Sequence, residues 1–133
     1  MNRLDFAGRT AVVTGGAAGI GLAVAARLAA SGARVSLWDR DATALAQAAG
    51  TLPDGAHSQA LDVADDTAVA RAAQATADAL GRIDVLVCSA GITGPNVPLA
   101  DYPVAEWKRV FDVNVHGLFL CNRAVVPVMK AGG

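Results

Sequence analysis

The chain has 133 residues, of which 53% are hydrophobic and 17% are charged, and its formal net charge is -1 at pH 7. This length allows one domain with its own core and is too short for two, so residues 1–133 are expected to form a single unit. The small net charge excludes the basic footprint of a nucleic-acid or anionic-membrane binder, which leaves a small molecule as the expected partner.

The first half of the chain alternates short β-rich runs with helical ones. In chain order it predicts a strand over Thr10–Val13, a helix over about Gly19–Ala30, a strand over Arg34–Trp38 and a helix over Asp41–Ala49. Glycines follow both helices, Gly32 after the first and Gly50 after the second, and are expected to end them.

The second half continues the alternation. It predicts a strand over about His57–Leu61, a helix over Asp65–Leu80, a strand over Ile83–Cys88 and, after a loop rich in Gly and Pro, one long helix over Val104–Lys130 that Pro127 kinks or ends. Alternating β and α units with right-handed crossovers give an α/β fold with a doubly wound parallel sheet of the Rossmann type.

Several classes of site and location are not expected. Cys88 and Cys121 lie far apart in apolar segments and read as free thiols, and neither forms a close-paired metal pattern with His57 or His116, so no metal is predicted. The longest apolar stretch, residues 19–35, is interrupted by polar and charged residues and predicts no membrane span. Without a signal sequence, a cytoplasmic location is the default.

The glycine-rich turn from Thr14 to Gly21 joins the first strand to the first helix. Gly15 would make the tight turn, Gly19 would let the backbone approach a pyrophosphate, and Gly21 would let the helix pack against the strand. An ordinary turn in an Ala/Gly-rich protein is the alternative. No Lys-Ser or Lys-Thr pair follows, so the turn is not a P-loop, and its place between strand and helix favours a dinucleotide.

Asp39 ends the second strand, 20 residues after Gly19. A carboxylate there can accept hydrogen bonds from the adenosine ribose hydroxyls and would repel a 2′-phosphate, which favours NAD. The alternative is a helix cap, a role for which Asp41 is better placed. Arg40 could bind a 2′-phosphate, so NADP stays open.

At this point the chain resembles the short-chain dehydrogenase/reductase family, whose TGxxxGxG motif matches Thr14 to Gly21. Ala18 stands where NADP-preferring relatives often have a basic residue. Asp62 and Val63 resemble the pair that contacts the adenine, and residues 88–91 resemble the family's NNAG segment, from which they depart at the first two positions. The resemblance implies a cofactor site made of Gly15, Ala18, Gly19, Ile20, Gly21, Asp39, Arg40, Asp62, Val63, Ser89, Ala90 and Gly91.

Asn114 is the last match. Helical spacing puts it on one face with Trp107, Phe111 and Leu118, so a buried amide with hydrogen-bond partners is expected. In the family, the Asn of this helix supports the catalytic lysine through a water, and the resemblance implies the same supporting role here.

The family's catalytic Ser, Tyr and Lys have no counterpart in the chain. The one tyrosine, Tyr102, precedes the long helix and is followed four residues later by Glu106 in place of Lys. We therefore expect these 133 residues to be the cofactor-binding half of a longer protein, and to be inactive alone.

The resemblance implies an NAD-dependent oxidoreductase that interconverts a secondary alcohol and a ketone, with a sugar or 2-keto-3-deoxy sugar acid as substrate. The alternatives are an enzyme similar to 3-oxoacyl carrier-protein reductases and a non-catalytic NAD-binding module. A methyltransferase using S-adenosylmethionine is disfavoured, because those enzymes usually carry an acid where Thr14 stands. Relatives usually form tetramers, so a homo-oligomer, dimer or tetramer, is implied.

Overall fold

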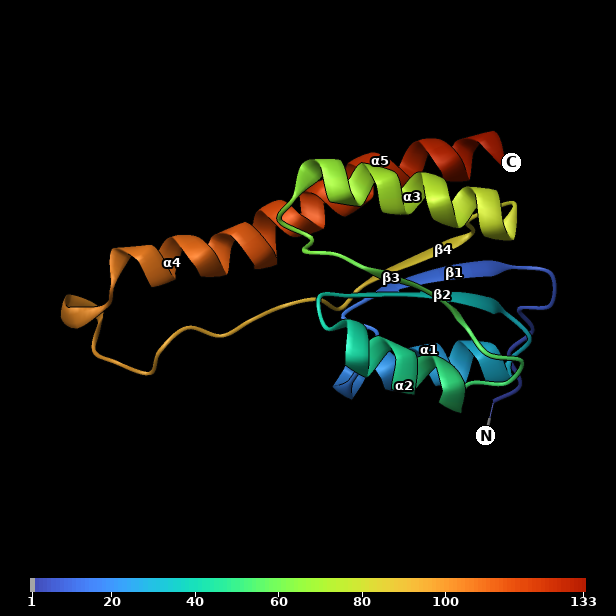
Figure 1. The fold of residues 1–133 in the computed structure, drawn as a ribbon, viewed down its shortest axis with the longest axis horizontal. Helices are drawn as coiled ribbons and strands as arrows, with labels where there is room; N and C mark the ends of the chain where they lie inside the picture. The colour runs from blue at the N-terminus through green and yellow to red at the C-terminus, as the bar shows by residue number, and fades with distance from the viewer. Residues whose placement is uncertain (1) are drawn as a thin grey trace.

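A computed structural model describes residues 2–133 and shows a parallel sheet with helices on both faces (Figure 1). The strands are β1 (Thr10–Thr14), β2 (Arg34–Asp39), β3 (His57–Ala60) and β4 (Val85–Cys88). Their order in the sheet is β3-β2-β1-β4, and every neighbouring pair is parallel. The expected doubly wound α/β fold is thereby confirmed.

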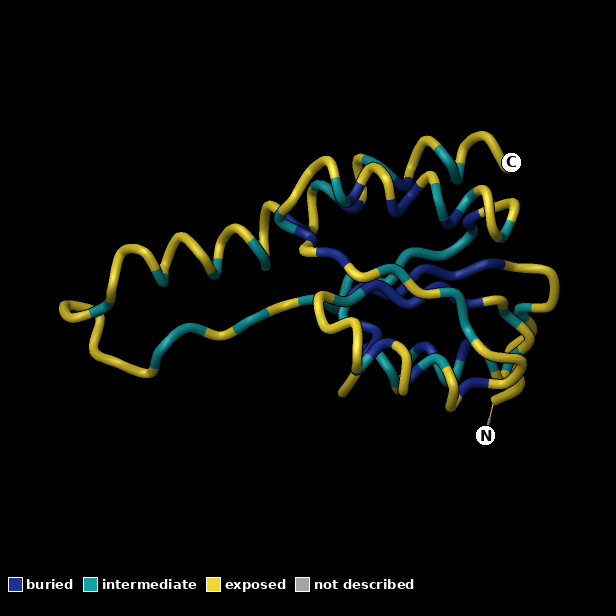
Figure 2. The backbone as a smooth tube through the Cα atoms, in the orientation of Figure 1, coloured by how far each residue is buried: buried dark blue, intermediate teal, exposed yellow. Residues whose placement is uncertain are grey.

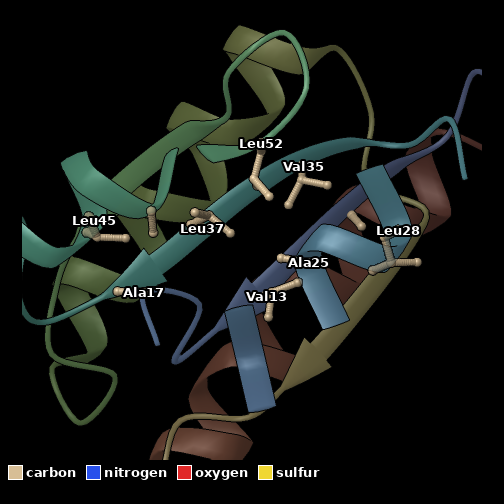
Figure 3. Close-up of a cluster of buried hydrophobic side chains, with 10 residues drawn as sticks. Val13, Ala17, Ala25, Leu28, Val35, Leu37, Leu45 and Leu52 are labelled. Atoms are coloured by element: carbon tan, nitrogen blue, oxygen red, sulfur yellow. The ribbon is translucent and has the colours of Figure 1, made fainter. Parts of the chain in front are cut away.

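Two helices cover each face of the sheet. Helices α1 (Gly19–Ala30) and α2 (Ala42–Thr51) lie on one face, and α3 (Asp66–Leu80) and α5 (Gly117–Ala131) lie on the other (Figure 1). Figure 3 shows the core of the first face, where Val13, Val35 and Leu37 of the strands meet Ala25 and Leu28 of α1. The opposite core packs Val12 and Trp38 against α3 and α5.

The start and end signals read from the sequence are mostly confirmed. Asp41 caps α2 by accepting a hydrogen bond from the Ala44 N–H, and Asp65 caps α3 in the same way. Gly32 follows α1 with a φ of +99°, the left-handed conformation that glycine adopts at little cost.

The expectation that Gly50 ends the second helix is wrong. Gly50 lies inside α2, which continues to Thr51. The helix stops because Pro53 follows Leu52 and pushes it into extended backbone, with ψ at 149°. The turn itself is made by Asp54 and Gly55, both with positive φ.

The long helix predicted over Val104–Lys130 is correct in extent but not in regularity. It consists of α4 (Val104–Phe111), a π-helical turn η2 (Asp112–His116) and α5, preceded by a short 3-10 helix η1 (Leu99–Asp101). Pro127 lies inside α5 and does not end it. Within residues 2–133, no helix has the length and apolar character to cross a membrane.

Helix α4 and the segment before it extend away from the sheet (Figure 1), and Figure 2 shows that their residues are mostly exposed. Several exposed side chains on α4, η2 and α5 are large and apolar: Val104, Trp107, Phe111, Val115, Leu118, Phe119 and Val126. These helices therefore present an apolar surface that the described residues leave uncovered.

Candidate functional site

The glycine turn lies where the carboxyl ends of β1 and β4 meet. Gly15 has a φ of +64°, and a Cβ on it would stand 2.9 Å from the Ala90 Cα, so only glycine fits this contact. The Thr14 hydroxyl oxygen accepts hydrogen bonds from the N–H groups of Ser89 and Ala90, at 3.1 Å each. The TGxxxGxG turn and the segment that resembles NNAG are thus held against each other.

The N-terminus of α1 opens directly from this turn. Ala18 is its N-cap residue, and among the described residues no side chain caps the helix, so its first N–H groups lack partners within it. Gly19 has a φ of +56° with open space around it, and Ile20 is 79% exposed. Free N–H groups at the positive end of a helix dipole fit a pyrophosphate.

Gly21 allows α1 to pack closely on the turn. A Cβ on Gly21 would stand only 2.1 Å from the Gly15 carbonyl oxygen, a contact that side chains do not make. This contact with the turn requires glycine at position 21, and the part that Gly21 plays beside a cofactor stays a prediction.

The Asp39 carboxylate lies beside the glycine turn. Its Oδ2 accepts a hydrogen bond from the Ala17 N–H at 3.1 Å, and its Oδ1 accepts one from the Asp41 N–H at 3.2 Å. Asp41 caps α2, so the alternative that Asp39 is the cap is wrong. The Asp39 side chain is therefore fixed at the end of β2, next to the position a dinucleotide would occupy.

An open pocket lies at the carboxyl ends of the strands, the edge at which open α/β sheets bind their ligands. Seven of the predicted cofactor residues line it: Gly15, Asp39, Arg40, Asp62, Val63, Ala90 and Gly91. Five predicted cofactor residues lie outside this lining. They are Ala18 in the turn, Gly19, Ile20 and Gly21 at the start of α1, and Ser89, whose N–H donates to the Thr14 hydroxyl. The structure therefore brings together one carboxylate from β2, one that follows β3, and the backbone that follows β4.

Four further residues line the pocket that the sequence alone did not single out: Trp38, Leu61, Ile92 and Val113. They add apolar groups to a lining that contains two carboxylates, the mixture common in small-molecule sites. The available signal was position, because all four directly adjoin predicted residues in the sequence: Trp38 before Asp39, Leu61 before Asp62, Ile92 after Gly91 and Val113 before Asn114.

The Asn114 expectation needs correction, because this amide is exposed and not buried in an apolar stripe. Its neighbours Trp107 and Leu118 are 52% and 47% exposed. Residues 2–133 cover this helix surface only in part, through the Ile92 loop and the Tyr102 ring, so its periodicity does not correspond to burial.

Asn114 nevertheless has the hydrogen-bond partners that were predicted. Its Oδ1 accepts from the Ile92 N–H and its Nδ2 donates to the Ile92 carbonyl, both at 2.8 Å. The π-helical turn η2 contains Asn114, and π-turns often occur at functional positions. The amide ties the loop after Gly91 to the long helix, at the edge of the pocket.

Both cysteines are free thiols. Cys88 is half-buried beside the Asn122 amide, whereas Cys121 is buried in the core and burial raises its thiol pKa to about 12. At neutral pH Cys121 is therefore a protonated core residue and not a nucleophile.

Comparison with known proteins agrees with this geometry. The family model described as short chain dehydrogenase matches residues 9–133. The chain is 53% identical over 96% of its length to a 2-dehydro-3-deoxy-L-rhamnonate dehydrogenase (NAD(+)) of a Sphingomonas species, covering 51% of that protein. It is 39% identical to a rhamnolipids biosynthesis 3-oxoacyl-[acyl-carrier-protein] reductase of Pseudomonas aeruginosa, covering 95% of this chain and half of that protein.

Solved structures give the same result. An NAD+-bound xylitol dehydrogenase superimposes with a TM-score of 0.93 at 34% identity, over 97% of this chain and 51% of that one. Levodione reductase superimposes with a TM-score of 0.89 at 35% identity, over 96% and 51%. The chain spans about half the length of the curated relatives it matches.

Proposed function

The chain belongs to the short chain dehydrogenase family, and on that premise we propose that the whole protein is an NAD-dependent oxidoreductase that interconverts a secondary alcohol and a ketone. The proposed substrate is a sugar or sugar acid. The observation that carries the cofactor assignment is the Asp39 carboxylate, held at the glycine turn and lining the pocket at the carboxyl ends of the strands.

Charge at the end of β2 favours NAD over NADP. A 2′-phosphate beside the Asp39 carboxylate would meet like charge, whereas free ribose hydroxyls can donate hydrogen bonds to it. Arg40 is the cationic residue among the described residues that line the pocket, and its charge could offset that of a phosphate.

The residues of the chain fit the parts of this cofactor. The uncapped N-terminus of α1 would bind the pyrophosphate, and Asp62 with the apolar walls of the pocket would bind the adenine. When bound, NAD supplies the nicotinamide ring that accepts or gives a hydride. Asn114 would fix the loop that carries Ile92 beside the nicotinamide end of the bound NAD.

The substrate class rests on similarity. The Sphingomonas relative at 53% identity acts on a 2-dehydro-3-deoxy sugar acid by name, and the xylitol dehydrogenase acts on a sugar alcohol by name. The 3-oxoacyl-[acyl-carrier-protein] reductase is less similar, at 39% identity, and remains the alternative.

Association and location also belong to the proposal. A homo-oligomer, dimer or tetramer, would cover the exposed apolar surface of α4 and α5. A cytoplasmic location accords with the proposed small-molecule chemistry.

The cofactor assignment is tested by titrating the whole protein with NAD and NADP by calorimetry. We expect clear preference for NAD, and we expect Asp39→Asn to reduce the ratio of the two affinities by about 10- to 100-fold, since a charge-assisted hydrogen bond is lost. Asp41→Asn is the matched control: the adjacent carboxylate caps α2, a role that Asn also performs, so the ratio should stay unchanged. Preference for NADP in the unsubstituted protein would overturn the assignment.

The reaction is tested by following NADH absorbance while sugar acids, sugar alcohols and 3-oxoacyl thioesters are offered. Turnover of a sugar or sugar acid supports the proposal, and turnover of the thioesters alone favours the alternative. Tight NAD binding without turnover of any alcohol or ketone would identify a non-catalytic binding module.

A further inference from the structure

Three polar side chains form a cluster in the core beneath the nucleotide pocket. Ser36 and Trp38 lie on β2, Thr76 lies on α3, and all three are fully buried. The Trp38 Nε1–H lies 3.2 Å from the Ser36 Oγ and 3.2 Å from the Thr76 Oγ1, and the two hydroxyl oxygens are 3.3 Å apart. The cluster therefore joins the central strand to the helix that packs against it.

His57 of β3 extends this cluster to a third element. Its Nδ1 lies 2.8 Å from the Ser36 Oγ, and burial lowers the pKa of its imidazole, which favours the neutral form. The Gln59 Nε2, which can only donate, lies 3.4 Å from the His57 Nε2, so neutral His57 accepts there and donates its Nδ1–H to the Ser36 Oγ. The Trp38 indole N–H donates to the two hydroxyl oxygens, so a chain of hydrogen bonds connects Trp38 to His57.

The end of this chain reaches the proposed cofactor site. Trp38 directly precedes Asp39, borders the pocket, and packs in the same core cluster as Leu61 and Val63 of the pocket wall. An indole can pack against apolar neighbours in more than one orientation, but its single N–H can satisfy the buried hydroxyls in only one. Buried polar groups of this kind specify an arrangement at some cost in stability.

We propose that Thr76 and Ser36 are positioning residues for the adenine end of the pocket, because their hydroxyls fix the Trp38 indole in the cluster that contains Leu61 and Val63 of the pocket lining. This inference rests on the proposed function, since it assigns a role within the NAD site. It predicts that removing one hydroxyl weakens binding of the base while leaving the nicotinamide end unaffected.

The test compares Thr76→Val, which keeps the shape and loses the hydroxyl, with Thr76→Ser, which keeps the hydroxyl. Affinities of the whole protein for NAD and for nicotinamide mononucleotide, which lacks the adenosine half, are measured by calorimetry and by competition. Thr76→Val should bind NAD about three- to tenfold more weakly, the equivalent of one buried hydrogen bond, and Thr76→Ser should bind it as the parent does. Affinity for the mononucleotide should be equal in all three proteins.

A second readout follows the indole itself. When Trp107 and any tryptophan outside residues 1–133 are replaced by Phe, the emission of Trp38 alone reports its surroundings. NAD should change this emission in the parent and in Thr76→Ser, and should change it less in Thr76→Val. If Thr76→Val does not fold, Ser36→Ala breaks the same chain and takes its place, with the same expected pattern.

The outcomes separate the inference from the proposed function. Parent-like NAD affinity in Thr76→Val would overturn the inference alone, and so would an equal loss for NAD and for the mononucleotide, which marks a general loss of structure. Failure of the unsubstituted protein to bind NAD would overturn the proposed function, and the inference with it.

Discussion

Substitution of Gly21 by alanine tests whether the glycine turn depends on contact or on backbone freedom. An added Cβ would stand 2.1 Å from the Gly15 carbonyl oxygen, about 0.9 Å short of the 3.0 Å that such contacts keep. The obstructing atom belongs to the backbone of the turn, so no side-chain rotation can relieve the clash. Helix α1 or the turn must move.

The expected cost follows from this geometry. Overpacking costs about 1–3 kcal/mol, and a rigid backbone neighbour puts Gly21→Ala near 3 kcal/mol. At roughly 2–4 °C per kcal/mol for a protein of the relatives' size, the unfolding midpoint should fall by about 6–12 °C. Affinity for NAD should fall as well, because the displaced turn carries the proposed pyrophosphate site.

Gly50→Ala is the matched control. Gly50 lies within α2, and a Cβ there would meet nothing within 4 Å. Alanine is the better helix former by about 1 kcal/mol, so this variant should melt a few degrees higher and bind NAD as the parent does. Thermal unfolding followed by circular dichroism measures both variants. A Gly21→Ala protein as stable as the parent would refute the contact argument.

Two further predictions concern the ends of β4. Asn114→Leu removes both hydrogen bonds to Ile92, so amide hydrogen exchange at Ile92 should become faster while exchange in the core strands stays unchanged. Equal protection of the Ile92 amide in both proteins would contradict the role of Asn114 in holding this loop. The Arg82 guanidinium, by its hydrogen bond, holds the pKa of Asp84 below its ordinary value. A lowered folded-state pKa means that the stability it contributes is present above the unfolded pKa and is lost as the pH falls through the folded one. Asp84→Asn should therefore flatten the acid side of a stability–pH profile below about pH 4, by a small amount because Arg82 is half exposed; identical acid slopes would contradict it.

Short-range patterns in the sequence were enough for much of the fold. The cap at Asp41, the glycine end signal at Gly32 and the alternation of strands and helices each depend on residues a few positions apart. The prediction for Gly50 is wrong because two end signals lie within the same few residues. Pro53 restricts the backbone of Leu52, and this restriction, rather than the glycine, sets the end of the helix.

Motif spacing was enough to predict the glycine turn and the acid at the end of β2, because a motif with fixed spacing between strand and helix leaves few alternatives for a nucleotide. Which residues share the pocket, and which face of the long helix stays exposed, depends on how the elements pack together. The strand order β3-β2-β1-β4 brings Asp39, Asp62 and Ala90 to one edge, and Asn114 bonds to Ile92, which lies 22 positions away. Such contacts depend on how elements distant in the sequence pack together. The spacing of apolar residues along one helix does not show which other elements will pack against it.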